Sequence, residues 1–365
     1  MTDSLPVPRR IVIRTPNWLG DAILALPAIA AVRRTMKGGV LAVAAPAPLA
    51  PLFAEETSAA QDEIVTLAHA NDSASLRAGA FDAILLLPNS FRSAWVARQA
   101  GIVERWGYAG AFRGPLLTRV VKRPRGVMHH AEYYKTLVTE LRMEARDELP
   151  VVRPRPATAE RADALLALEG IPIGTRIAGF APGAAYGHAK RWPPRRVAEV
   201  ITRLTHERGA TCVLVGAAGD RDAGREIESA VPPDVRTVNL IGRTDLSLLV
   251  GILARCGVFV SNDSGAMHLA AAVGVPVTAI FGPTDERVTA PVGDNDVLVH
   301  EVFCRPCMLR DCPIDHRCMK RITVDRVFDA VNRRLTAVRR GAERGAGVPA
   351  SDELGGVQGS PPFKQ

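Results

Sequence analysis

No stretch of this sequence is long and apolar enough to cross a lipid bilayer. The longest nearly apolar run spans residues 22–32, whereas a membrane-spanning helix needs about 20 such residues. The first 14 residues hold two prolines and two adjacent arginines ahead of any apolar run, which is unlike a secretory signal. We therefore expect a cytoplasmic protein.

The sequence also lacks the usual signatures of nucleic-acid binding. It contains no RNP-type aromatic motif, no zinc-finger spacing that ends in paired histidines, and no basic helix with heptads. Its net charge is nevertheless +8, and basic residues gather at 92–125 and at 190–196. This surplus indicates an acidic partner, which by charge alone is nucleic acid, anionic lipid or a phosphorylated sugar. The plain alternative is a solvated basic face without a partner.

One stretch, residues 258–285, carries the strongest local pattern. Residues 258–260 and 277–281 are short apolar runs that predict strands, and the turn SNDSG opens a small-residue helix that ends at Gly274. Strand, helix and strand at this spacing form a βαβ unit with parallel strands. A helix that starts at Ser264–Gly265 presents backbone N–H groups and a positive dipole end, which favour an anion. The pattern therefore predicts a phosphorylated ligand.

The whole chain repeats this alternation of strands and helices. With 365 residues, 47% apolar and 23% charged, it is long enough for two ordinary domains. We expect an α/β protein with two doubly wound parallel-sheet domains at 1–150 and 151–340, a closing helix at 324–340 and a disordered tail at 341–365. The elements predicted before residue 258 are strands at 10–14, 40–44, 64–67, 83–87, 177–180 and 211–215, helices from residue 21 to about 36, at 129–143, 159–169 and 194–208 and from about 221, a loop at 68–79, and a linker at 149–158.

Four segments in this order resemble a known family. They are RTPNWLGDAILALPAI, PGAAYGHAKRWP, SNDSG-x-M-H-x-A-A-A-x-G-x-P with FGPTD, and CRPCMLRDCPIDHRCM. They resemble the lipopolysaccharide heptosyltransferases, glycosyltransferase family nine, and the last is similar to the branch that adds the second inner-core heptose. The segments cover most of residues 11–325.

The resemblance implies a GT-B fold, with an N-terminal acceptor domain and a C-terminal nucleotide-sugar domain. It also implies inverting transfer of L-glycero-D-manno-heptose from ADP-heptose to Kdo-lipid A that already carries one heptose. A heptosyltransferase of the first or third type, or a family member acting on another glycolipid, is the alternative within the family.

Asp21 follows the first predicted strand and the turn PNWLG, near the start of a helix. Read from the residues alone, it is a helix cap, because Asp at a helix N-terminus accepts hydrogen bonds from free N–H groups. The resemblance implies another role, since Gly20–Asp21 matches the family motif whose Asp is the proposed base. Sugar transfer needs a base to take the proton of the attacking hydroxyl.

Lys190 lies in GHAKRWP, at the carboxyl end of a predicted strand and beside small residues that let a ligand approach the backbone. A solvated lysine is the plain interpretation. The resemblance implies that Lys190 contacts the diphosphate or the donor sugar. The neighbouring Arg191 is a second candidate for the same contact.

The turn SNDSG supplies the remaining donor ligands. Ser264 and the Gly265 N–H are the expected phosphate ligands, whereas the carboxylate of Asp263 should avoid phosphate and, as the resemblance implies, hold hydroxyls of the donor sugar. His268 lies one turn into the helix and points toward the same end. A single histidine among alanines is, however, more often a core residue than a ligand.

Asp220 and Asp222 form an Asp-x-Asp pair, which holds a divalent metal in other glycosyltransferases. Arg221 between them argues against a metal here. We expect Asp220 to cap a helix or to contact the nucleotide ribose. The diphosphate then leaves with help from Lys190, the backbone and the helix dipole, so we expect that catalysis needs no cofactor.

Four of the six cysteines lie close together, at 304, 307, 312 and 318, with His316 between the last two. Disulfides are disfavoured in a cytosolic protein, which leaves a structural zinc, reduced thiols or an iron–sulfur centre as alternatives. Cys212 and Cys256 fall in or beside predicted strands and are expected to be inert.

The expected partners are ADP-heptose and an anionic glycolipid at the cytoplasmic face of the inner membrane. A basic surface is sufficient to attract a protein to anionic lipid without a membrane span. A function of a different class, a non-catalytic module that binds nucleotide or phospholipid, would keep the SNDSG turn and Lys190 but would have no use for Asp21.

Overall fold

The apolar runs of the sequence form the strands of two parallel sheets. The structure, a computed structural model, describes residues 8–345, with side chains for 8–336. Sheet A has the order β4 (Glu63–Leu67), β2 (Val40–Pro46), β1 (Arg10–Arg14), β5 (Ala83–Leu86), β6 (Glu104–Tyr108) and β7 (Arg119–Val121). Sheet C has the order β11 (Thr237–Asn239), β10 (Thr211–Leu214), β9 (Ile177–Ala181), β12 (Cys256–Asn262), β13 (Val277–Phe281) and β14 (Asp296–Val299).

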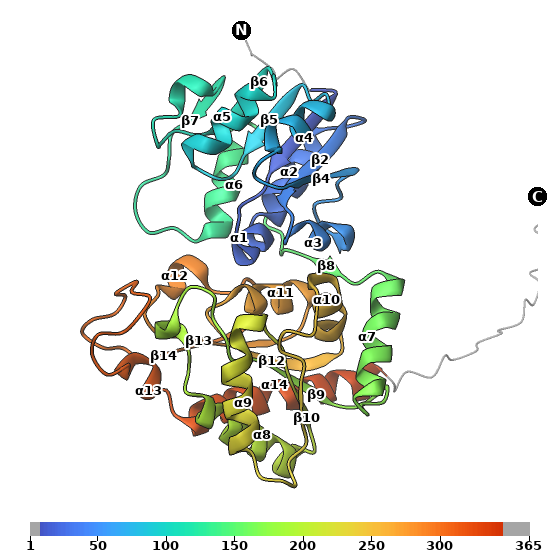
Figure 1. Cartoon of the computed structure of the whole chain (residues 1–365), viewed down its shortest axis with the longest axis vertical. Coiled ribbons are helices and arrows are strands. Elements are labelled where there is room, and N and C mark those ends of the chain that lie inside the picture. Colours follow the sequence, from blue (N-terminus) through green and yellow to red (C-terminus); the bar gives the residue numbers. More distant parts are fainter. Residues whose placement is uncertain (1–7, 346–365) are drawn as a thin grey trace, which may run out of the picture.

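Both sheets are doubly wound, as expected for a GT-B fold. In sheet A the direction of winding reverses between β1 and β5, and in sheet C it reverses between β9 and β12. Crevices for ligands open at such switch points, beyond the carboxyl ends of the strands. The two halves lie one above the other in Figure 1, with α1 (Leu19–Leu24) at the lower side of the N-terminal half, next to α11 (Gly265–Val273).

Helices cover both faces of each sheet. On sheet A, α2 (Leu26–Thr35) and α6 (His130–Glu140) pack together on one face, whereas α4 (Asp72–Ala78) and α5 (Phe91–Gln99) cover the other. On sheet C, α10 (Leu246–Ala254) and α11 lie on the side of the N-terminal half, whereas α8 (Pro194–Arg208) and α14 (Val324–Gly345) lie beneath. One cluster of buried residues includes members from both halves, such as Ile13, Ala22, Met267 and Phe281. The core therefore continues across the junction.

The sequence explains where the main helices end. Gly209 follows α8 with φ of 60° and Gly274 follows α11 with φ of 95°. Only glycine adopts this left-handed conformation without steric cost, so both positions end a helix. Pro276 then leads directly into β13. The predicted unit at 258–285 is confirmed, with β12 beginning two residues earlier, at Cys256.

The expected linker at 149–158 is more ordered than predicted. Within it lies β8 (Val152–Arg153), antiparallel to β3 (Glu56–Thr57), and α7 (Pro156–Leu168) begins in it. The buried carboxylate of Glu55 accepts hydrogen bonds from Arg155 N and Thr158 Oγ1, each at 2.8 Å. These bonds tie the crossover to the N-terminal half, while the division at residue 150 stays a prediction.

Three other local predictions differ from the structure. The segment 68–79 was expected to be a loop, but it contains α4, whose Asp72 is buried. The expected helix up to residue 36 is divided at Ala25 into α1 and α2, because Pro27 opens a new helix. The last helix, α14 (Val324–Gly345), extends into the expected disordered tail, of which residues 346–365 lie outside the described residues.

Among residues 8–345, no helix combines the length and the apolar character that crossing a membrane requires.

The two halves meet closely where α1 touches α11. A Cβ atom placed on Gly20 would come within 2.6 Å of His268 Cδ2, and one on Gly265 would come within 2.9 Å of Leu19 Cβ. Non-bonded carbon atoms prefer about 3.5–4.0 Å. Each helix therefore has a glycine at its first or second residue because the other helix leaves no room for a side chain.

We expect Gly20→Ala to destabilise the protein. Alanine gains about 0.5–1 kcal/mol over glycine within a helix, but the clash with His268 costs about 1–3 kcal/mol as overpacking, so a net loss of about 1 kcal/mol should remain. Urea unfolding measures this loss. Gly114→Ala is the matched control, since no atom lies within 4 Å of a Cβ at Gly114. Equal stabilities of Gly20→Ala and the wild type would contradict the close contact of α1 with α11.

Candidate active site

Asp21 is held by a histidine from the far end of its own domain. It is the third residue of α1, and its Oδ1 lies 2.7 Å from His130 Nδ1, at the start of α6. Among the described residues, no backbone N–H of α1 donates to this carboxylate. Asp21 is partly exposed, with 23% of its side chain accessible. A carboxylate with one oxygen fixed and its face open to a cavity is suited to accept a proton.

The adjacent histidine joins the two halves. His129 Nδ1 accepts a hydrogen bond from Ala131 N, which leaves the proton on Nε2. His129 Nε2 lies 2.9 Å from the carbonyl oxygen of Ala290, at the end of α12 (Glu286–Thr289), and donates to it. The start of α6 is therefore anchored to the C-terminal half, which fixes His130 and through it Asp21.

The turn after β12 opens toward the same place. Ser264 is the N-cap residue of α11, but its hydroxyl does not cap the helix and instead lies 3.1 Å from Ser261 Oγ. Asn262 holds the turn against the neighbouring loop, because its Nδ2 donates to the carbonyl of Pro182 at 2.7 Å and its Oδ1 accepts from Trp192 N. The N-terminus of α11 thus has no side-chain cap, which leaves its dipole available to an anion.

Lys190 and Asp263, predicted to have separate roles, contact each other. Lys190 Nζ lies 2.5 Å from Asp263 Oδ2 and above the ring of Tyr186. Thr284 Oγ1 donates to the same oxygen at 2.6 Å. Among the described residues no group donates to Asp263 Oδ1. The pair is nearly buried, so the lysine is fixed as a cation at the cavity wall and one carboxylate oxygen stays free.

Arg191 and Asp220 form a second ion pair, and neither residue lines the cavity of Asp21. Arg191 Nη2 pairs with Asp220 Oδ1 at 3.2 Å, and Asp220 Oδ2 accepts from Ala217 N. Asp222 is exposed and pairs with Arg225, one turn along α9 (Arg221–Ala230). The two carboxylates of the Asp-x-Asp sequence therefore bind different arginines, and Asp220 does not cap α9.

His268 is buried where α11 meets Gly20. It is 5% exposed, and its Nδ1 has no hydrogen-bond partner among the described residues. Burial lowers the pKa of His268 to about 4, although the charges of Asp263 and Asp21 oppose this shift. The ring is therefore neutral at pH 7, and the residue lines the cavity that holds Asp21.

Two connected cavities lie between the halves, with volumes of about 280 and 320 Å³. Cavities of this size suit a ligand larger than a single sugar. The Asp21 cavity is lined by Trp18, Gly20, Asp21, Leu24, His130, Ala185, Tyr186, Lys190, Asp263, Ser264, Gly265, His268 and Thr289. The β10 cavity is lined by Trp18, Leu19, Gly20, Ala181, Gly183, Ala184, Ala185, Val215, Gly216, Ala217, Asp220, Thr244, Asp245, Leu246, Leu249, Ser264, Gly265 and Ala266.

The cavities share one wall and differ elsewhere. Trp18, Gly20, Ala185, Ser264 and Gly265 belong to both. Titratable groups gather in the Asp21 cavity, whereas aliphatic side chains dominate the deeper part of the β10 cavity. The start of α11 therefore lies between a polar and an apolar compartment.

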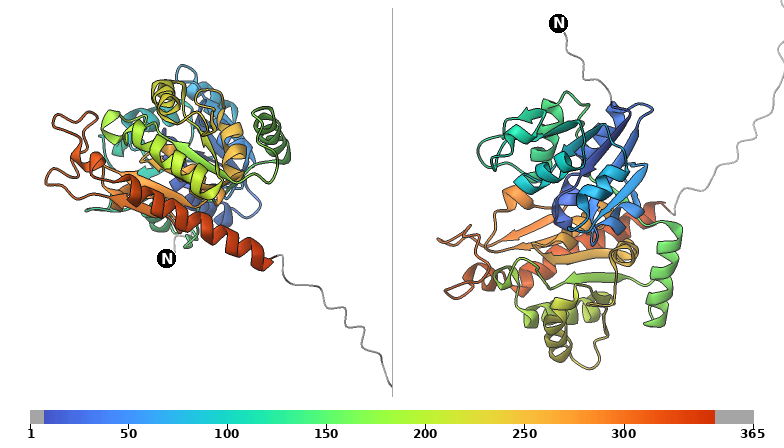
Figure 2. Two further views of the ribbon diagram at one scale, coloured as in Figure 1. Left: turned by 90° about the horizontal axis from the view of Figure 1, so that it is seen from below. Right: turned by 45° about the horizontal axis from the view of Figure 1, so that its top comes forward.

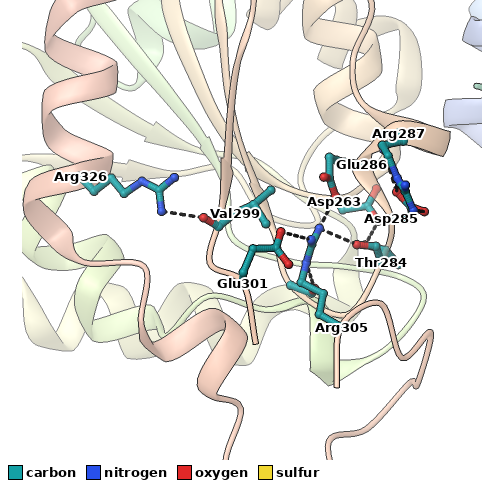
Figure 3. A network of polar contacts seen from close by, with 10 residues as sticks. Asp263, Thr284, Asp285, Glu286, Arg287, Val299, Glu301, Arg305 and Arg326 are labelled. Carbon is teal, nitrogen blue, oxygen red and sulfur yellow. Dashed lines mark hydrogen bonds and ion pairs between the residues drawn. The ribbon is translucent and has the colours of Figure 1, made fainter. Parts of the chain in front are cut away.

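The cysteine-rich segment, residues 304–318, fastens the loops that carry Lys190 and Thr284. Arg305 is 4% exposed at its side chain and pairs with Glu286 and Glu301. It also donates to the carbonyls of Gly282 and Thr284, at 2.8 and 2.9 Å (Figure 3). In the view of Figure 2 seen from below, this segment forms the loops beside β14 and α13 (Arg317–Lys320).

Further contacts join this segment to the loop of Lys190. Tyr186 Oη donates to the carbonyl of Met308 at 2.9 Å, and Ala189 N donates to that of Arg310 at 2.8 Å. A Cβ atom on Gly187 would come within 2.4 Å of the Arg310 carbonyl oxygen. The segment thus lies against the loop that positions Lys190. All six cysteines are free thiols, and among residues 8–345 no three His, Cys, Asp or Glu side chains are arranged to hold a metal ion.

Sequence reasoning missed His130 and Thr284. Each acts through a contact with a residue more than 20 positions away, which no local pattern reveals. The adjacent pair His129–His130 at the start of a predicted helix was the available signal for the first. All predicted site residues except Arg191 line one of the two cavities.

The two doubly wound sheets face each other across a cleft. A carboxylate lies on one side of the cleft, and an uncapped helix start with a fixed lysine lies on the other. This arrangement is that of a GT-B glycosyltransferase. The comparison with known families agrees, since residues 73–317 match the model of glycosyltransferase family 9 (heptosyltransferase). The chain belongs to this family.

Relatives support the same assignment. The chain is 32% identical to lipooligosaccharide heptosyltransferase 2 of Haemophilus influenzae, over 79% of this chain and 88% of the relative. It is 31% identical to lipopolysaccharide heptosyltransferase 2 of Escherichia coli, over 78% of this chain and 85% of the relative. The structure of E. coli ADP-heptose LPS heptosyltransferase II superposes with a TM-score of 0.78 and 28% identity, over 90% of this chain and 99% of that one.

We expect His268 to make the protein less stable in acid. Its pKa is about 4 in the folded state and near 6.5 when exposed, so between these values the unfolded chain binds more protons and stability falls as the pH falls. A shift of this size corresponds to at most about 3 kcal/mol. Urea unfolding at pH 7 and pH 4.5 should show a smaller loss for His268→Gln than for the wild type. The same loss in both would mean that His268 titrates normally.

Proposed function

We propose that the protein is an inverting glycosyltransferase that moves L-glycero-D-manno-heptose from ADP-heptose to the first heptose of the lipopolysaccharide inner core. The observation that carries this proposal is the position of Asp21 and of the Ser264–Gly265 turn in the walls of one cavity. Membership of family 9 and the similarity to heptosyltransferases 2 support the donor and the acceptor class.

The donor spans both cavities. Its adenosine occupies the β10 cavity, where Val215, Leu246 and Leu249 supply apolar contacts and Asp220 lies close enough to the wall to accept from ribose hydroxyls. The diphosphate lies at the shared wall, where the Gly265 N–H and the Ser264 hydroxyl meet it. The heptose then enters the Asp21 cavity.

The charges of the site favour departure of ADP. Negative charge grows on the leaving diphosphate as the glycosidic bond breaks, and a cation or dipole fixed in advance stabilises that charge. Lys190 and the start of α11 provide such groups, while the free Oδ1 of Asp263 accepts from a donor-sugar hydroxyl. His268 lines the same cavity and, being neutral at pH 7, adds no charge to it. No metal is needed for this step.

Asp21 acts as the base. The acceptor hydroxyl attacks the anomeric carbon from the face opposite to ADP, and Asp21 takes its proton as the new bond forms. His130 donates to Asp21 Oδ1 and so orients the carboxylate, which leaves the other oxygen to face the hydroxyl. Because the displacement occurs once, the anomeric configuration inverts.

The acceptor, Kdo-lipid A carrying one heptose, is a membrane glycolipid. We infer that the protein works in the cytoplasm and binds the cytoplasmic face of the inner membrane as a peripheral protein. Its net charge of +8 supports this inference, since basic residues near an anionic leaflet each contribute about 1 kcal/mol of attraction. Sedimentation with anionic and with neutral vesicles tests it.

One experiment tests the reaction directly. The protein is incubated with ADP-heptose and either Kdo-lipid A or the same acceptor carrying one heptose, and the products are weighed by mass spectrometry. Gain of one heptose by the second acceptor alone is expected. Gain by Kdo-lipid A alone would indicate a transferase of the first type, and binding of ADP-heptose without any transfer would indicate a binding module.

We expect Asp21→Asn to be folded, to bind ADP-heptose and to be almost inactive. Asparagine keeps the size and the hydrogen bond with His130 but does not accept a proton, so kcat should fall by about 10²–10⁴. Stability should change by less than the ~2 kcal/mol that a lost helix cap can cost. Calorimetry of donor binding beside a transfer assay measures both effects, and near-normal turnover would exclude Asp21 as the base.

We expect Lys190→Met to raise the KM for ADP-heptose and to lower kcat. A charge-assisted contact contributes roughly 1.5–3 kcal/mol, or about ten- to a hundredfold. Lys190 also neutralises Asp263, and the double variant Lys190→Met/Asp263→Asn separates the two roles. If the double variant regains wild-type affinity, Lys190 serves only Asp263. Arg191→Met is the matched control, because Arg191 pairs with Asp220 and lines neither cavity.

A further inference from the structure

A third, smaller pocket lies in the N-terminal half, at the carboxyl ends of β1, β4 and β5. Its volume is about 60 Å³, and its polar lining residues include Arg14, Asn17, His69, Asp72, Arg92 and Ser93. None of these residues lines the two cavities of the donor site. The residues proposed to bind the donor and to act as the base lie outside this pocket.

Positive charge around the pocket exceeds negative charge. Arg14, the last residue of β1, donates to Asn17 Oδ1 at 2.7 Å. Arg113 is fully buried behind the pocket and donates to the carbonyls of Tyr108 and Pro88 and to Ser93 Oγ. Neither guanidinium has a carboxylate oxygen within 4.0 Å among the described residues. Burial lowers the pKa of both arginines to about 10.

Buried charges in proteins are normally paired, because removing an ion from water is costly. The side chain of Arg305, which is 4% exposed, follows this rule, since it has two carboxylate partners, Glu286 and Glu301. Among residues 8–336, Arg113, which is fully buried, has no such partner, and Arg14, which is partly buried, has none within 4.0 Å either. A missing counter-charge beside an open pocket indicates a ligand that carries it.

The single carboxylate of the pocket does not balance the arginines. Asp72 Oδ2 lies 3.5 Å from Arg92 Nη2, and Asp72 Oδ1 is buried without a hydrogen-bond partner among residues 8–336. Arg92 itself is 59% exposed at its side chain and lies at the rim. One negative charge thus faces three guanidinium groups, while a buried carboxylate oxygen is available to a ligand hydroxyl.

We propose that this pocket binds an anionic group of the acceptor, a phosphate or a carboxylate together with its neighbouring hydroxyls. The inference rests on the proposed function. The pocket opens at the same edge of sheet A as the turn that leads to Asp21, and Asn17 of its lining lies in that turn. An acceptor held there by its charge would present a hydroxyl toward Asp21. The pocket is then a specificity site for charged acceptors.

Two substitutions test the proposal, one that removes a positive charge from the pocket and one that removes its negative charge. Arg92→Gln removes a cation from the rim, so the KM for the acceptor should rise about tenfold, while the KM for ADP-heptose and kcat stay within twofold. Asp72→Asn removes the only carboxylate and enlarges the positive surplus, so the acceptor KM should fall. Arg98→Gln is the matched control, because it removes the same charge from an exposed position on the same helix, α5, outside the pocket.

The acceptor identifies the group that binds. Each protein is assayed with Kdo-lipid A carrying one heptose, with the same acceptor after removal of its phosphates, and with one whose carboxyl groups are reduced to alcohols. The penalty of Arg92→Gln should disappear for the form that lacks the bound group, which tells phosphate from carboxylate.

The outcomes separate this inference from the proposed function. In an active enzyme, three results would overturn the pocket assignment. The first is an acceptor KM that stays within twofold of wild type in Arg92→Gln, and the second is a KM increase in this variant that persists with both altered acceptors. The third is an equal rise of the acceptor KM in Arg92→Gln and Asp72→Asn. A wild-type protein that transfers no heptose would instead contradict the proposed reaction.

Discussion

The close contact between α1 and α11 is the constraint on which the site depends. Gly20 and Gly265 leave no room for a side chain between the two helices, so the carboxyl edges of both sheets face each other across a short distance. Asp21, one residue after Gly20, and Ser264, one residue before Gly265, are thereby brought to one cavity. A larger residue at either glycine would separate the carboxylate from the anion-binding turn.

The polar groups around the donor site are fixed before any ligand arrives. Lys190 and Thr284 both bind the same carboxylate oxygen of Asp263, and Arg305 donates a hydrogen bond to the backbone carbonyl of Thr284. In the proposed reaction, such preorganisation means that little reorientation is needed when charge develops on the diphosphate. The cysteine-rich segment thus supports the chemistry through its arginine, whatever the state of its thiols.

The sequence predicted the parts of the site that local pattern controls. Asp21, Lys190 and Ser264 each lie in the segment that follows a parallel strand, and in a doubly wound sheet such segments lie at the ligand crevice. What pattern did not reveal are contacts between distant residues. The salt bridge of Lys190 with Asp263 and the hydrogen bond of His130 with Asp21 join positions 73 and 109 apart.

Burial of charge was also outside the reach of local pattern. The basic run at 92–125 predicted either contact with an acidic partner or a solvated face, yet Arg113 within it is fully buried. The segment at 68–79 is rich in small polar residues and was expected to be a loop, although Asp72 in it is nearly buried in α4. Arg113 faces inward because the carbonyl groups of Tyr108 and Pro88 accept its hydrogen bonds. Asp72 faces inward because it lines the small pocket of the N-terminal half.

The wall shared by the two donor cavities has a consequence for how this enzyme type can change its donor. Trp18, Gly20 and Ser264 touch both compartments, so with the donor placed as we propose, a substitution among them should alter recognition of the base and of the sugar together. Val215, Leu246 and Leu249 line the β10 cavity alone. Redesign toward another nucleobase therefore has an independent surface to work on, whereas a new sugar must be accommodated among the residues that we propose to perform the reaction.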